Sequence, residues 1–393
     1  MSTDSDLFKP GPLRPIVKEL KALFENQKVI EAYNDAIKNV KDFPDDPPLK
    51  PSVNIWRGRS NDDFCYYFNN WFDFLATPTK AGLGFIEPFT QFYYDNDKAF
   101  YFLNNFEIDG KKMIFDWTVK FIEARGEFMD TPSPEALDAI SEWVKDPATH
   151  IDAYIMPPGG YQTFNDFFAR KLRPGARPIS DVGDDTTVVA PADSELNMIN
   201  SALVEDSKIK TKGHQKLGVK ELLNGHPSWE KFIGGTAISC VLLPSDYHHY
   251  HAPVTGKLIH YEIVSGIYNG IQDAPEWFHN GNVGASEGDF SIFEQFHRGI
   301  FIFETNNFGL VAMVVVGLNT INKIGFEMNS VNTLEYFMNV SPEKPQWVYK
   351  GKRLGFFKYG GSLNILLFEQ DAFQGIKVLQ GQRIGKLTKP NGG

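Results

Sequence analysis

The chain has 393 residues, of which 42% are hydrophobic and 22% charged, and its net charge is −10. This composition is typical of a globular protein long enough for two domains. The acidic balance argues against nucleic acid as a partner and against docking on an anionic membrane by charge alone. Two cysteines, Cys65 and Cys240, are too few for a disulfide framework. The first residues show no apolar signal segment, so we expect a soluble, cytoplasmic protein without a stable membrane anchor.

The first 155 residues predict a helical region. Apolar residues recur there at helical spacing, and Ser133 followed by Pro134 is typical of a helix start. The expected helices cover residues 15–40, 61–78, 111–127, with an end at Gly126, and 133–147, with an end at Pro147.

The composition changes at Pro-Pro-Gly-Gly, residues 157–160, where we place a domain boundary between 155 and 156. Beyond it, short apolar runs separated by Gly, Pro, Asn and Asp predict strands. The fold class is therefore α+β, with a helical N-terminal domain over 1–155 and a β-rich domain over 156–393. The expected strands cover residues 186–191, 237–244, 256–264, 299–305, 310–317, 363–368 and 384–389.

Three histidines lie together in "LLPSDYHHYHAPVTG": His248, His249 and His251. On a strand, alternation places His249 and His251 on one face and His248 on the other. Structural histidines at a strand end, a metal site and a general base beside a nucleophile are all compatible with the cluster. No cysteine or carboxylate signature accompanies it, so we expect no metal.

A lone serine, Ser362, follows two glycines in "YGGSLNI", directly before an apolar run. An ordinary hairpin turn explains this pattern. A backbone cut also explains it, because Gly360 and Gly361 allow the strained backbone that a side chain needs to reach its own preceding carbonyl. Asp193 in "VVAPADSEL" is a turn aspartate when taken alone. With Ser362 and a histidine it completes a Ser-His-Asp set, which is defined by geometry and not by chain order.

Five segments, in this order along the chain, resemble the motifs of the phosphatidylserine decarboxylase family. They are "TFNDFFARKLRPGARPI" (163–179), "VVAPADSEL" (188–196), "LLPSDYHHYHAPVTGKL" (242–258), "FIFETNNFGLVAMVVVGLNTIN" (301–322) and "VYKGKRLGFFKYGGS" (348–362). The resemblance implies that the β-rich domain over 156–393 is a catalytic domain of that family's type.

The resemblance implies a proenzyme that cuts itself between Gly361 and Ser362. Its products would be a beta chain of residues 1–361 and an alpha chain of residues 362–393, which remain associated. Ser362 would become a covalent pyruvoyl group, the cofactor of the enzyme. Leu363 stands where the family usually has Ser or Thr, which puts the rate of cleavage in question.

The resemblance also implies roles for the other site residues. His251 matches the base for Ser362, Asp193 matches the residue that orients this base, and His248 matches an earlier histidine that serves the active site. In "ADSEL", Ser194 replaces the family's common glycine after the aspartate, which could alter the turn that holds Asp193.

The implied activity is that of a carboxy-lyase. A pyruvoyl ketone forms a Schiff base with the amine of a substrate whose carboxylate leaves as carbon dioxide. We expect a free, aromatic L-amino acid such as tryptophan as this small-molecule substrate, because the acidic chain shows no membrane anchor. The aromatic-rich stretch 64–75 could line a pocket for its ring, or could be ordinary helix core. The alternatives are a phosphatidylserine decarboxylase that makes phosphatidylethanolamine, and an uncleaved relative without enzymatic activity.

Overall fold

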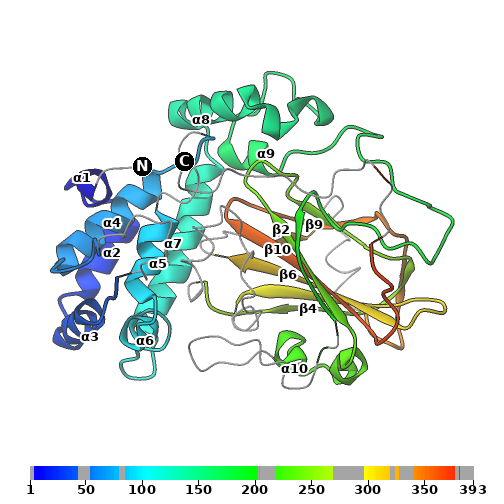
Figure 1. The fold of residues 1–393 in the computed structure, drawn as a ribbon. Helices are drawn as coiled ribbons and strands as arrows, with labels where there is room; N and C mark the ends of the chain where they lie inside the picture. The colour runs from blue at the N-terminus through cyan, green and yellow to red at the C-terminus, as the bar shows by residue number, and fades with distance from the viewer. Residues whose placement is uncertain are drawn as a thin grey trace.

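The computed structural model of the protein describes most of the chain, and all structural statements concern the described residues. These are residues 4–42, 54–78, 85–201, 203, 218–268, 296–318, 324–326, 340–376 and 380. Helices fill the N-terminal part and strands the C-terminal part, as the colours of Figure 1 show from blue to red. The predicted α+β fold class is confirmed.

The helices of the described residues follow local start signals. They are α1 (Asp4–Leu7), α2 (Pro15–Leu23), α3 (Gln27–Lys38), α4 (Asn61–Asp73), α5 (Ile86–Tyr93), α6 (Asp97–Asn104), α7 (Met113–Met129), α8 (Pro134–Lys145), α9 (Phe164–Phe168) and α10 (Val219–Leu222), with short 3-10 helices η1 (Pro147–Thr149), η2 (Ile151–Ala153) and η3 (Pro227–Phe232). Ser133 caps α8 and Pro134 is its first residue, as predicted. Ser60 and Asp63 form a capping box at the start of α4.

Gly126 does not end a helix, which corrects the sequence prediction. It lies inside α7, which continues to Met129. A glycine inside a helix costs about 1 kcal/mol relative to alanine. Burial of the Met129 side chain, which is 1% exposed, offsets this cost through packing that the local sequence does not show.

The aromatic side chains of α4 form the centre of the helical core. The buried members are Phe64, Tyr67, Phe68, Trp71 and Phe72. The ring of Phe68 contacts Trp117 and Phe121 of α7 at centroid distances of 4.9 and 5.2 Å. These rings pack against one another, so the stretch 64–75 is helix core and not the wall of a substrate pocket.

The described strands form two antiparallel sheets. The strands are β1 (Glu195–Ser201), β2 (Thr236–Leu242), β3 (His249–His251), β4 (Gly256–Val264), β5 (Arg298–Glu304), β6 (Leu310–Leu318), β7 (Ile324–Phe326), β8 (Gln346–Val348), β9 (Arg353–Phe357) and β10 (Gly361–Phe368). The larger sheet has seven strands in the order β1-β2-β10-β6-β5-β4-β8, and the smaller has three in the order β3-β9-β7. The strand that begins with the predicted cleavage site, β10, therefore lies between β2 and β6 in the larger sheet (Figure 1).

The two faces of β10 are covered by different elements. Leu366 and Phe368 share a core with Tyr250 of β3 and Leu354 of β9, so the smaller sheet covers this face. Leu363, Ile365 and Leu367 share the opposite core with residues of α10 and η3. Because side chains alternate along a strand, Ser362 and Asn364 lie on the face of the smaller sheet.

Two of the predicted strands are not confirmed by the structure. Residues 186–191 form no strand, although the Val189 N–H donates to the Pro253 carbonyl at 2.9 Å. An apolar run gives a strand only where neighbouring backbone is free to pair with it, and Pro191 has no N–H to donate. The strand predicted at 384–389 lies outside the described residues. No helix in the described part of the chain is long and apolar enough to cross a membrane.

A shared core joins the helical part to the sheets. It contains Met129 of α7, Trp143 of α8, Phe164 and Phe168 of α9, and Tyr359, which lies just before β10. Figure 1 shows α8 and α9 beside this junction. Residues from both sides of the predicted boundary at 155/156 thus contact one another, and the boundary itself stays a prediction.

Candidate active site

Ser362 occupies a buried position near the start of β10. It pairs with Leu242 of β2 and Gly317 of β6, and its side chain is 1% exposed. Its Oγ atom is buried and has no hydrogen-bond partner among the described residues. Just before the strand, Gly360 has a φ of 155°, a conformation that favours glycine. A nucleophilic oxygen without a partner therefore follows a backbone segment that only glycine adopts easily.

Asn364 is a second polar residue on the same face of β10. Its side chain is fully buried, and within the described part of the chain neither its amide nitrogen nor its amide oxygen has a hydrogen-bond partner. It lies opposite Cys240 of β2 and Val315 of β6. An amide buried in such apolar surroundings without hydrogen bonds is costly, by about 1–3 kcal/mol.

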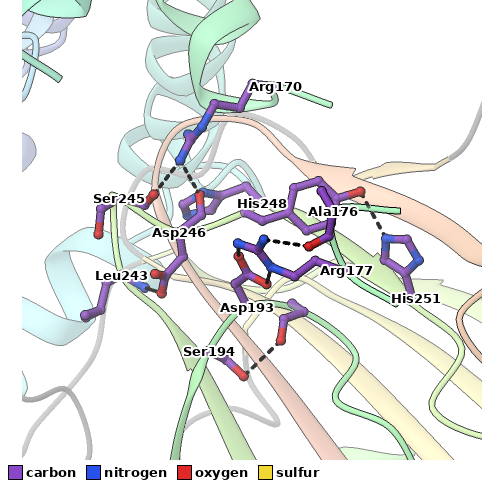
Figure 2. A network of polar contacts seen from close by, with 12 residues as sticks. Arg170, Ala176, Arg177, Asp193, Ser194, Leu243, Ser245, Asp246, His248 and His251 are labelled. Carbon is purple, nitrogen blue, oxygen red and sulfur yellow. Dashed lines mark hydrogen bonds and ion pairs between the residues drawn. The ribbon is translucent and has the colours of Figure 1, made fainter. Parts of the chain in front are cut away.

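The loop that carries the histidines is held by a buried arginine and by its own aspartate. Arg170, 1% exposed, donates from its guanidinium to the backbone carbonyls of Ser245 and Asp246, the latter at 3.1 Å (Figure 2). The Asp246 carboxylate accepts the Leu243 N–H at 2.7 Å. Burial raises the pKa of Asp246 to about 6. These contacts fix the path of the chain from β2 to the histidines.

His248 is buried and neutral. Its Nδ1 lies 2.9 Å from the Asp246 carbonyl, and a carbonyl only accepts, so Nδ1 carries the hydrogen. Its Nε2 then holds a lone pair, and this buried atom has no hydrogen-bond partner in the part of the chain that the structure describes. Burial holds the pKa of His248 well below its usual value, with the charge of Arg170 adding to the effect. The ring packs on Phe168 at a centroid distance of 3.8 Å.

His249 and His251 lie on one face of β3, as alternation predicts. Both rings contact the ring of Tyr247, at centroid distances of 5.0 and 5.6 Å. His251 donates from Nδ1 to the Gly351 carbonyl at 2.7 Å and accepts at Nε2 from the Tyr247 hydroxyl at 3.0 Å. His249 Nε2 donates to the Ala169 carbonyl, and burial lowers its pKa to about 3. Among the residues that the structure describes, no group of His, Cys, Asp or Glu is arranged to hold a metal ion.

Asp193 forms a bidentate ion pair with Arg177. The Arg177 Nε and Nη2 atoms donate to the two carboxylate oxygens at 2.9 and 2.7 Å, as Figure 2 shows. The side chains of Arg177 and Asp193 are 38% and 25% exposed. The contacts found for the Asp193 carboxylate are therefore with an arginine, and a role in orienting His251 stays a prediction.

A cavity of about 770 Å³ lies beside this ion pair and includes His251, Tyr247 and Asp193 in its wall. Its wall also carries several cationic residues from two separate stretches of the chain. These are Lys171, Arg173, Arg177, Lys352 and Arg353. The cavity is positive although the whole chain is acidic, because net charge says nothing about where charges gather.

The structure brings two of the predicted site residues together. His251 and Asp193 line the same cavity, while Ser362 and His248 each present a buried polar atom without a partner. Sequence reasoning missed Arg170, Arg177 and Asn364. The basic stretch "RKLRPGARPI" is the sequence signal for the two arginines, and the single polar residue within the apolar run "LNILLF" is the signal for Asn364.

A family model described as phosphatidylserine decarboxylase matches residues 164–386. Phosphatidylserine decarboxylase proenzyme 2 of Oryza sativa subsp. japonica is 30% identical over 253 residues, which are 64% of this chain and 36% of the relative. Proenzyme 3 of Schizosaccharomyces pombe is 28% identical over 305 residues, 74% of this chain and 28% of the relative. The proenzyme of Fusobacterium nucleatum subsp. nucleatum is 31% identical over 238 residues, 61% of this chain and 70% of the relative. The matched part of the chain thus spans about a third of the first two relatives and about two thirds of the third.

These comparisons confirm the resemblance that the five motifs indicate. Two predictions are confirmed as properties of the family: that it consists of decarboxylases, and that these form a pyruvoyl group from their own chain. The match includes Ser362, Asp193 and the histidine loop, whose individual roles stay predictions.

The expected substrate and partner, a free aromatic amino acid such as tryptophan, is wrong. The relatives are named for phosphatidylserine, a lipid. Both arguments for an amino acid fail in the structure. The aromatic stretch 64–75 is helix core, and the acidic net charge conceals a cavity with cationic walls.

Proposed function

This chain belongs to the phosphatidylserine decarboxylase family, and on that premise we propose that it is a self-cleaving enzyme that converts phosphatidylserine into phosphatidylethanolamine and carbon dioxide. One observation carries the proposal: Ser362 lies inside the family match with a buried Oγ that has no partner. The cytoplasmic location expected from the sequence stays part of the proposal.

Self-cleavage uses only groups of the chain and one water molecule. The Ser362 oxygen attacks the Gly361 carbonyl carbon, the peptide C–N bond breaks as an ester C–O bond forms, and the hydroxyl proton passes through a base to the released amine. Loss of the Cα proton of residue 362 expels the Gly361 carboxylate and leaves dehydroalanine. Hydrolysis of the dehydroalanine by one water molecule then releases its nitrogen as ammonia, and a pyruvoyl group remains.

The surroundings of Ser362 fit such a group. The position is 1% exposed and faces the core beneath the smaller sheet, so water has little access to a ketone there. When formed, the pyruvoyl group supplies an electron sink for an amine substrate that loses its carboxylate. The chain's own residues bind and orient the substrate.

Two histidines can act as the base in this reaction. The family resemblance assigns the role to His251, whose Nε2 accepts the Tyr247 hydroxyl in the uncut chain. His248 is the alternative, because its unprotonated Nε2 has no partner and its lowered pKa keeps it neutral. A neutral imidazole with an unprotonated ring nitrogen can accept a proton.

The cavity beside Asp193 supports a substrate that carries a phosphate. The phosphatidylserine headgroup has an amine, a carboxylate and a phosphodiester, with a net charge of −1. Arginine and lysine side chains bind phosphate oxygens strongly, and Arg173 and Lys352 lie in the cavity wall. A free aromatic amino acid offers these cations only its carboxylate and has no phosphate.

The test combines mass spectrometry with an activity assay. Purified protein should yield two chains, residues 1–361 and residues 362–393, and the processed enzyme should release carbon dioxide from vesicles that contain phosphatidylserine. The Ser362→Ala variant is the control and should stay uncut and inactive. A chain that remains uncut under native conditions would favour the relative without activity. A processed chain that releases no carbon dioxide from these vesicles would refute the proposed substrate.

A further inference from the structure

Lys358 and Tyr359, which precede the two glycines of the predicted cleavage site, contact residues far away in the sequence, at the end of α7 and in α9. Lys358 forms an ion pair with Asp130, the residue that follows α7. The backbone N–H of Tyr359 donates to the Asn165 side-chain oxygen at 3.1 Å, a bond between residues 194 positions apart. The Asn165 amide nitrogen in turn donates to Asp130 at 3.1 Å. Asp130 and Asn165 thus connect α7, α9 and the chain just before β10.

The Tyr359 ring is enclosed from several sides. It is 5% exposed, and its centroid lies 5.2 Å from each of the rings of Phe164 and Phe168. The guanidinium carbon of Arg125, a residue of α7, lies 5.4 Å from the same ring. Arg125 is 1% exposed. A cation beside a ring is most favourable when both are removed from water.

Arg125 is itself fixed by the helical core. Its Nε donates to the Trp71 carbonyl at 3.1 Å and its Nη2 to the Phe74 carbonyl at 2.7 Å. These carbonyls lie at the C-terminal end of α4, where a cation also interacts favourably with the helix dipole. A buried arginine held in this way has little freedom, so the ring that contacts it is held in place as well.

The same packing reaches the histidine loop. The ring of Phe168, which contacts Tyr359, also packs on His248. The backbone N–H of Phe357 donates to the His248 carbonyl at 2.8 Å. The base candidate and the chain before the cleavage site are therefore held by common neighbours.

We propose that α7 positions the self-cleavage site, with Arg125 and Asp130 as positioning residues that act through Tyr359 and Lys358. This inference rests on the proposed function. The family match begins at residue 164, so α7 lies outside it, and the inference gives a role to part of the chain that the match does not cover.

The physical reason is the freedom of two consecutive glycines. Gly360 and Gly361 allow many backbone conformations, and attack by the Ser362 oxygen requires one of them. Strand pairing fixes the chain from Gly361 onward, through β2 and β6. On the upstream side, paired strand β9 ends at Phe357, and the contacts of Lys358 and Tyr359 fix the chain between β9 and Gly360. A displacement of about 1 Å can cost a reaction roughly a hundredfold in rate.

The test measures the rate of self-cleavage in full-length chains made by pulse-labelled cell-free synthesis and separated on a denaturing gel. Lys358→Met should slow cleavage about two- to fivefold, as expected for the loss of a partly exposed ion pair, and Lys358→Arg should restore the rate. Arg125→Gln should slow cleavage more than about tenfold. The matched control is Lys120→Met, which removes another ion pair of α7, between Lys120 and Glu19 at 3.1 Å, and should leave the rate unchanged.

A second measurement separates positioning from general stability. The same substitutions are placed in the uncut Ser362→Ala background, and their thermal unfolding is compared. Lys358→Met and Lys120→Met should shift the midpoint equally little, although only the first slows cleavage. If Arg125→Gln does not fold, the Lys358 variants decide.

Three outcomes bear on the inference. Slowed cleavage in Lys358→Met with rescue by Lys358→Arg supports it. Wild-type cleavage rates in folded Lys358→Met and Arg125→Gln chains overturn it and leave the proposed function intact. Absence of cleavage in the wild-type chain overturns the proposed function and this inference together.

Discussion

Replacement of Asn364 by valine tests whether the buried polar face of β10 is as costly as its contacts indicate. The amide is fully buried, has no hydrogen-bond partner, and lies between Cys240 and Val315 on the neighbouring strands. Leu366 follows it on the same face. Valine has high strand propensity and places only carbon atoms in this position.

The expected change follows from these surroundings. An unsatisfied buried amide costs about 1–3 kcal/mol, and Asn364→Val removes that cost. Valine is slightly larger than asparagine, so part of the gain is lost to tighter packing. We therefore expect the free energy of unfolding to rise by about 1–2 kcal/mol. Asn364→Asp should have the opposite effect, because it buries a carboxyl group that has no partner.

Hydrogen exchange is the appropriate assay, because the helical core and the sheets can open separately. The substitutions are made in the Ser362→Ala background, which keeps the chain uncut, and the exchange of β10 amides is followed by mass spectrometry. Slower exchange in Asn364→Val than in the parent is the expected result. Faster exchange, equivalent to a loss of about 1 kcal/mol or more, would show that the amide has a partner such as a buried water, and would refute the reasoning.

Three further predictions concern the site and its supporting loop. If His251 is the base, His251→Ala should leave the chain uncut. If instead His248→Ala stays uncut and His251→Ala is cleaved normally, His248 is the base. Intact mass spectrometry distinguishes these two results. Burial raises the pKa of Asp246 from 3.8 to about 6, so the folded chain binds this proton more tightly than the unfolded chain. Stability should therefore fall by roughly 3 kcal/mol as the pH rises between these two values, and urea unfolding of Asp246→Asn should lack this part of the pH dependence. In Gly235→Ala, the new Cβ would lie 1.9 Å from the backbone carbonyl oxygen of the last residue of β10. The free energy of unfolding should therefore fall by about 1–3 kcal/mol, and an unchanged unfolding midpoint would contradict this.

The sequence by itself determined the features that depend on neighbouring residues. Ser133 and Pro134 mark the start of α8, because capping and the fixed φ of proline are local effects. The apolar runs at 237–244 and 363–368 became the adjacent strands β2 and β10. The five motifs and their order along the chain were enough to identify the family, because each motif is a local pattern of residue types.

Only the tertiary structure decided which distant residues meet. Nothing near Asp193 in the sequence indicates that Arg177 binds both of its carboxylate oxygens. Nothing near Tyr359 indicates contact with Arg125 or Asn165. The same limit explains the wrong substrate, because a net charge is a sum over the whole chain and an aromatic run has the same composition in a core as in a pocket. Which side chains share a cavity depends on how the helices and sheets pack, and packing joins residues that the sequence keeps far apart.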